Sequence, residues 1–175
     1  EEPPEGVLFL LTADSLAGVL PTIRSRCVSF AVAPVSLADC ARYCTAHGVD
    51  KKTAALYSEL FDGHIGTVLT AARDKARTEQ VDKAMELARA AQAGDSYTAA
   101  VLLAPYEKDK AGAAALLRDL RAVAAAGLQG SPHAPVQGQQ AQRTLRLAEA
   151  AIQRLGAQVN PKIVLTVFAA RLAHA

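Results

Sequence analysis

One short segment of this chain, residues 7–11, has the pattern of a strand that is buried on both faces. It reads Val-Leu-Phe-Leu-Leu and lies between Gly6 and Thr12. Uninterrupted apolar runs of this length are typical of parallel sheets that helices cover on both sides. Such a sheet needs several strands, and the sequence turns to helical patterns after this one. We therefore expect the segment to be the end of an α/β core, and the chain to be the C-terminal part of a longer protein.

From residue 36 onwards the apolar residues recur at helical spacing between clear start and stop signals. Ser36 and Asp50 are favourable N-caps, and Gly48 ends the first helical run. A third helix begins near Ile65. The later helical segments are 71–93, which ends at Gly94, then 96–103, 108–127, 139–155 and a last one that Asn160-Pro161 opens. The sequence thus predicts a mainly α fold that follows a short remnant of an α/β core.

The composition excludes several classes of protein. With 51% hydrophobic and 21% charged residues, the 175-residue chain can bury one or two small cores and is not disordered. Its formal net charge of +2 predicts no strong attraction to nucleic acid. No apolar run approaches the roughly 20 residues that span a bilayer, so no membrane association is expected. Three cysteines, an odd number, favour a reducing cytoplasm over a disulfide framework.

Two of the cysteines lie close to a histidine. Cys40, Cys44 and His47 would share one face of a helix. A metal site is one interpretation, but a single helix cannot easily supply a tetrahedral ligand set, and no fourth ligand has suitable spacing. We favour buried thiols that pack against the next helix, and we expect no metal site.

The chemically informative residues lie in the segment 20–27, Leu-Pro-Thr-Ile-Arg-Ser-Arg-Cys. Arg24 and Arg26 flank Ser25, and arginine presents a planar fork of donors that matches phosphate oxygens. At the edge of a domain, such an arginine can reach a neighbouring subunit and stabilise charge on a transferring phosphoryl group. The alternative is that both arginines only cap the end of a helix.

Residues 1–30 resemble the end of the AAA+ core of bacterial clamp-loader subunits. The stretch 9–14, Phe-Leu-Leu-Thr-Ala-Asp, is similar to the family's sensor-1 region. The stretch 19–23 is similar to its Leu-Pro-Thr-Ile helix, and residues 25–27 to its Ser-Arg-Cys motif. The resemblance implies that Arg26 is an arginine finger that acts on ATP held by the adjacent subunit, with Ser25 and Cys27 as its motif partners.

The same resemblance implies a division of the chain into three parts. Residues 1–33 would be the C-terminal remnant of the AAA+ core, residues 34–92 a helical lid whose three helices end near Arg73, and residues 93–175 an all-helical collar for oligomerisation. In the family, the third lid helix often carries a sensor-2 arginine that contacts nucleotide. Here the matching stretch, residues 63–68, reads Gly-His-Ile-Gly-Thr-Val and contains no arginine. This favours the delta-prime type of subunit, which does not hydrolyse ATP, over the gamma/tau type.

The expected function follows from the resemblance. It implies a subunit of the bacterial DNA polymerase III holoenzyme, a nucleotidyltransferase, that helps to load the sliding clamp on primed DNA in the cytoplasm. Its partners would be the gamma/tau and delta subunits, and through the assembly the clamp and DNA. We expect no catalytic activity and no bound cofactor in this chain, since ATP would be held by the neighbour. The alternatives are a gamma/tau-type or other AAA+ ATPase subunit, and a helical adaptor without a role in nucleotide chemistry.

Overall fold

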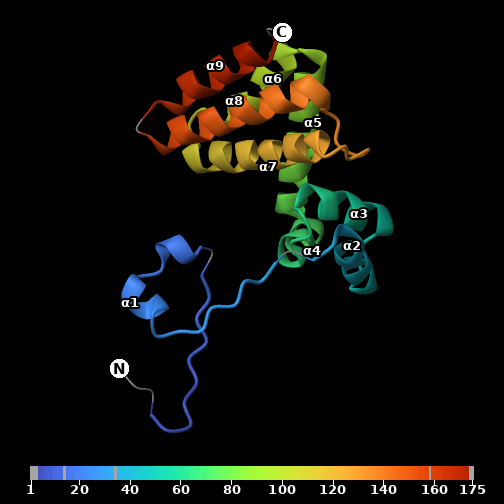
Figure 1. The fold of residues 1–175 in the computed structure, drawn as a ribbon. Coiled ribbons are helices and arrows are strands. Elements are labelled where there is room, and N and C mark those ends of the chain that lie inside the picture. Colours follow the sequence, from blue (N-terminus) through green and yellow to red (C-terminus); the bar gives the residue numbers. More distant parts are fainter. Residues whose placement is uncertain (1–3, 14, 34, 158, 174–175) are drawn as a thin grey trace. The chain divides into compact units, whose positions relative to one another are not determined.

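The computed structural model describes residues 4–13, 15–33, 35–157 and 159–173 (Figure 1). The chain divides into two compact units, Glu1–Ala33 and Pro34–Ala175. Over the described residues the regular secondary structure is helical and contains no strand. The prediction of a mainly α fold is therefore confirmed.

The first unit contains two short helical turns, η1 (Leu16–Gly18) and α1 (Pro21–Arg24). The strand predicted at residues 7–11 is wrong for this structure. The segment has no regular secondary structure, and its side chains are exposed, Leu10 by 86%. A strand is held by hydrogen bonds to a neighbouring strand, and no described residue of this chain offers one.

The second unit begins with three helices, α2 (Leu37–Ala46), α3 (Lys51–Leu60) and α4 (Ile65–Arg73). Their starts follow the predicted caps. The Ser36 hydroxyl accepts a hydrogen bond from the Asp39 backbone N–H, and the Asp50 carboxylate accepts from Lys52 and Thr53. The bond from Thr53 is also the main reason that the pKa of Asp50 is lowered. The predicted helices of this region are confirmed.

The rest of the second unit is a helical bundle in which α5, α7, α8 and α9 are longer than the first three helices. Its elements are α5 (Lys75–Ala93), α6 (Ser96–Leu103), η2 (Ala104–Tyr106), α7 (Lys110–Leu128), α8 (Gly138–Gly156) and α9 (Pro161–Ala173). The predicted end at Gly94 and the predicted start at Asn160 are confirmed, since Gly94 has φ 67° and the Asn160 side chain accepts from the Lys162 N–H. The continuous helix predicted over residues 71–93 is wrong. Asp74 ends α4, and its carboxylate caps α5.

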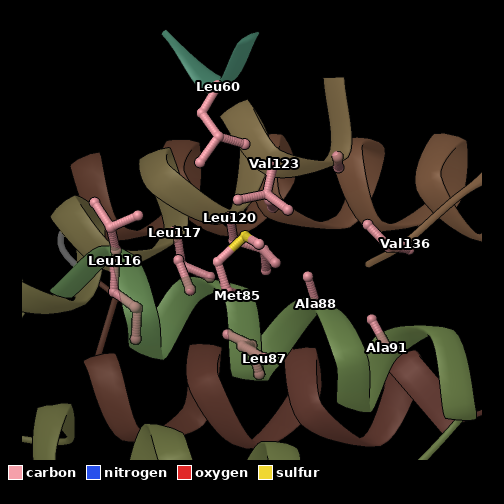
Figure 2. Close-up of a cluster of buried hydrophobic side chains, with 14 of the residues drawn as sticks. Leu60, Met85, Leu87, Ala88, Ala91, Leu116, Leu117, Leu120, Val123 and Val136 are labelled. Carbon is pink, nitrogen blue, oxygen red and sulfur yellow. The ribbon is translucent and has the colours of Figure 1, made fainter. Parts of the chain in front are cut away.

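The buried core lies in the second unit. α7 packs against α5 and α8, and α6 packs against α9. Leucines of α7 lie beside Met85 of α5, and Leu60 points toward them from α3 (Figure 2). Ala88 and Ala91 are fully buried in α5, where their small side chains allow a close approach of the neighbouring helices. The core thus relies on leucine and alanine rather than on aromatic rings.

Gly127 marks the closest approach of the chain to itself near the end of α7. A Cβ atom at this position would lie 1.9 Å from the backbone carbonyl oxygen of Val136. A backbone oxygen cannot rotate away as the end of a side chain can. The path of the loop between α7 and α8 therefore requires glycine at position 127 of α7. Glycine within a helix lowers stability by about 1 kcal/mol relative to alanine.

We predict that Gly127→Ala destabilises the protein by about 1–3 kcal/mol, since overpacking costs of this order are usual in dense cores. Gly66→Ala in α4 is the matched control, because nothing lies within 4 Å of the Cβ it would add. That variant should be neutral or more stable by up to about 1 kcal/mol. Urea unfolding of both variants is the measurement. Equal stability of the two would contradict this account of Gly127.

Candidate functional site

The arginine segment lies at the C-terminal end of α1 in the first unit. α1 is a single turn, and Pro21 at its first position fixes a helical φ without the loss of a hydrogen bond. Arg24, Ser25, Arg26 and Cys27 follow one another at its end, and all four are exposed. The structure therefore presents the sequence-predicted residues together on one short, solvent-facing turn.

Two side chains of this segment meet on one carbonyl oxygen. Arg26 Nη1 donates to the Thr22 carbonyl at 3.1 Å, and the Ser25 hydroxyl donates to the same oxygen at 3.1 Å. This is the arrangement expected of residues that cap a helix end. Both bonds are exposed, so water can replace either partner and the net contribution of each bond to stability is small. The contact holds Arg26 near α1 without burying its guanidinium.

The cysteines are in two different environments. Cys27 is exposed, whereas Cys40 and Cys44 are fully buried on α2. Burial raises the pKa of the Cys44 thiol, and the neighbouring Cys40 adds to this effect. His47 is not directed at the thiols: its ring stacks on Tyr43 at 3.9 Å, with Nδ1 2.8 Å from the Tyr43 carbonyl oxygen. The predicted burial of the two thiols is confirmed. In the part of the chain that the structure describes, no three His, Cys, Asp or Glu residues are arranged to hold a metal ion.

The glycine-containing stretch at residues 63–68 forms the start of α4. Gly63 has φ 73°, and a Cβ there would lie 2.2 Å from the Val35 carbonyl oxygen. His64 is the N-cap residue, is exposed and makes no side-chain capping bond. Close packing of the backbone thus accounts for Gly63.

The sequence analysis did not predict one ion pair of the second unit, in which a buried carboxylate binds a half-buried arginine. Asp119 in α7 binds Arg77 of α5 through both carboxylate oxygens, and Arg77 Nη2 lies 2.6 Å from Oδ1. Gln80 Nε2 also donates to Asp119, at 2.8 Å. The hydrogen bonds with Asp119 raise the pKa of Arg77. The sequence does carry a signal for this site, because Asp119 interrupts the apolar stripe between Leu116 and Val123.

A shallow cavity of about 350 Å³ lies between α6 and α9. Its lining is mainly apolar and includes Leu103, Leu165 and Ala169, together with the carboxylate of Glu107. Tyr97 beside it is 78% exposed. Over the described residues, no helix has both the length and the apolar character to cross a membrane.

We predict that only one of the three thiols reacts rapidly with a thiol reagent such as DTNB in the native protein. Cys27 is exposed, whereas Cys40 and Cys44 should react at least about a hundredfold more slowly because buried thiols react only after local opening. Cys27→Ser should abolish the fast phase and leave the slow one. Equal rates for all three thiols would contradict the burial of α2.

The comparisons with known proteins bear on the arginine segment. Residues 1–36 match the family model described as DNA polymerase III, delta subunit. The match covers 36 of the 175 residues, and these include Arg24, Ser25, Arg26 and Cys27. It supports a relation of this segment to the clamp-loader subunits of DNA polymerase III. The comparisons with curated proteins and with solved structures give no match.

Proposed function

We propose that this protein is a clamp-loader subunit of bacterial DNA polymerase III, of the delta-prime type, that supplies Arg26 in trans to ATP on a neighbouring subunit. The observation that carries the proposal is the family match over residues 1–36, because it falls on the segment with the Ser-Arg-Cys motif. The exposure of this motif at the end of α1 is consistent with contact to another chain.

The chemistry of the proposal rests on the guanidinium of Arg26. Its planar fork can donate two parallel hydrogen bonds to phosphate oxygens, which a lysine ammonium cannot reproduce. A phosphate offers the guanidinium a full negative charge and two oxygens in bidentate geometry, whereas the Thr22 carbonyl offers one neutral oxygen. A γ-phosphate within reach would therefore compete well with the exposed Thr22 carbonyl. Ser25, which binds the same carbonyl, would keep the turn in shape when Arg26 leaves it.

The apolar residues of the first unit support a role as part of an AAA+ core. Residues 7–11 are an exposed apolar run, and Val28, Phe30 and Val32 alternate with small or polar residues as in a strand. Each large apolar side chain that becomes buried contributes about 1.5–3 kcal/mol. We propose that both segments become strands in the sheet of the AAA+ core, with residues 1–33 as its C-terminal part.

The remaining parts of the proposal concern the helical unit. Residues 34–92 would act as the lid and residues 93–175 as the collar that associates with the gamma/tau and delta subunits. The absence of an arginine from residues 63–68 supports a subunit that leaves ATP binding to its neighbour. Through the assembly, the protein would help to place the sliding clamp on primed DNA in the bacterial cytoplasm, without catalytic activity of its own.

A second candidate function is that of a helical adaptor in which Arg26 is only structural. The hydrogen bond from Arg26 to the Thr22 carbonyl favours it, because this is a capping contact. The two candidates differ in what the loss of Arg26 changes. A structural arginine affects stability, whereas a finger affects hydrolysis by the neighbouring subunit.

We predict that Arg26→Ala in a reconstituted clamp loader lowers the rate of clamp-stimulated ATP hydrolysis at least about tenfold. Arginines that act in trans raise the hydrolysis rate of GTPases by about 10³–10⁵. The effect on turnover is smaller where conformational steps limit the rate. Arg26→Lys should restore little, because the planar fork is lost.

Arg24→Ala is the matched control, since Arg24 lies on the same exposed turn but outside the finger position. It should retain most of the hydrolysis. Thermal unfolding and ATP hydrolysis are measured on the same assembled complexes. A loss of stability with unchanged hydrolysis per complex would favour the adaptor and contradict the proposed finger.

A further inference from the structure

Three consecutive residues at the end of α3 each contact a different part of the helical bundle. Glu59 accepts a hydrogen bond from Ser131 in the loop between α7 and α8. Leu60 is buried and points toward the core formed by α5 and α7 (Figure 2). The ring of Phe61 lies under the guanidinium of Arg77 in α5, 5.6 Å from its central carbon. One turn of α3 therefore makes polar, apolar and cation–π contacts to the bundle.

The partner of Glu59 is itself held firmly. Ser131 is 8% exposed, and its carbonyl oxygen accepts a hydrogen bond of 2.9 Å from Gln137 Nε2. The backbone N–H of Gln137 donates to the side chain of Gln92 near the end of α5, also at 2.9 Å. The loop that binds Glu59 is thus tied to α5 as well as to α7 and α8.

The partner of Phe61 is held by the buried carboxylate of Asp119. The side chain of Asp119 is 8% exposed and that of Arg77 is 25% exposed. Because Asp119 binds both terminal nitrogens of Arg77, it fixes the plane of the guanidinium that covers Phe61. Gln80 adds a third bond to the carboxylate. The orientation of Arg77 therefore depends on α7, although Arg77 belongs to α5.

The covalent joint between α4 and α5 would not fix the angle between these helices by itself. It is the single extended residue Asp74, with φ −92° and ψ 113°, which interrupts the helical backbone. Thr78 lies across this joint, and its hydroxyl donates to the Ala71 carbonyl at 2.8 Å. In Figure 1, α2, α3 and α4 form a group at one end of α5, apart from the longer helices of the bundle. This group is held against the bundle by packing of α4 on α5 and by the contacts of α3 with α7 and α5.

We infer that the C-terminal turn of α3, residues 59–61, is a rigid coupler that makes α2–α4 and α5–α9 move as one body, with Asp119 as the residue that positions it. A displacement imposed on α2–α4 is then passed to the bundle rather than absorbed at Asp74. Packed side chains and hydrogen-bond networks are the physical means of such coupling. This inference concerns the helical unit alone and does not depend on the clamp-loader assignment.

The test measures the distance between the two groups of helices in the full chain. Spin labels are attached by Arg42→Cys on α2 and Gln153→Cys on α8, both exposed positions, in a Cys27→Ser background. Pulsed electron spin resonance then gives the distribution of distances between the labels. We expect a narrow distribution in this parent and a distribution at least twice as wide after Asp119→Asn. The matched control is Glu149→Gln, which removes the charge of the exposed Arg121–Glu149 pair between α7 and α8 and should leave the width unchanged.

Circular dichroism of each variant shows whether its helices are intact. Should Asp119→Asn lose helicity, Glu59→Ala decides the question, because Glu59 is half-buried and its loss removes the contact to Ser131 alone. A wider distribution in a helical variant supports the coupler. An unchanged width in Asp119→Asn, or in Glu59→Ala if the former unfolds, overturns it and places the rigidity of the joint at Asp74 and Thr78.

Discussion

The arrangement of the helical unit depends on the carboxylate of Asp119. It is the one buried charged side chain among the described residues, and it stands within the apolar stripe of α7. A buried carboxylate is tolerated only where its oxygens are paired and hydrogen-bonded. Arg77 and Gln80 supply these partners from one face of α5. The two helices can therefore pack in one register, since any other would leave Asp119 without its partners.

This constraint extends from α5 and α7 to the rest of the unit. The guanidinium of Arg77 covers the ring of Phe61, the residue that follows α3. Gly127 allows the loop after α7 to pass close to that helix. The same loop presents Ser131 to Glu59. Apolar burial supplies most of the stability in such a bundle, whereas the polar contacts select one arrangement among several that leucine and alanine would allow. Replacing a buried ion pair by apolar residues is often neutral or stabilising, and we therefore propose that the role of this pair is specificity.

The first unit differs from the helical unit in how its structure is stabilised. Its described side chains include no buried one, and its arginine segment stands on a single helical turn. A segment without a core takes its final structure from whatever it packs against. This fits the proposed role, in which the turn with Arg26 faces another subunit and the apolar segments join a sheet. The helical unit needs no such partner for its own core.

Local signals in the sequence were sufficient for most helix boundaries. The residues that cap helix ends interact with backbone groups close to them in the sequence, so the sequence alone predicts these boundaries. They are Ser36, Asp50, Gly94 and Asn160. The break at Asp74 was missed because an aspartate within a helical pattern also fits an exposed position. The pairing of Arg77 with Asp119 joins residues 42 apart and has no local cause.

For the candidate site, too, the sequence predicted the local motif but not the contacts that depend on folding. The motif located Arg26, but its contact with the Thr22 carbonyl is a property of the folded turn and could not be predicted from spacing. The strand at residues 7–11 failed as a prediction because strands, unlike helices, depend on partners elsewhere.

The central claim is that, among the described residues, the buried core lies within residues 34–175, and that residues 1–33 engage a partner. Urea unfolding of the full chain and of a variant limited to residues 34–175 tests it most directly. The free energy of unfolding should agree within about 0.5 kcal/mol, because the buried side chains among the described residues all belong to the second unit. The dependence on urea should also be nearly unchanged, since it scales with the surface exposed on unfolding. A clear loss of stability or of urea dependence in the shorter chain would show that the first unit belongs to the core and contradict the account.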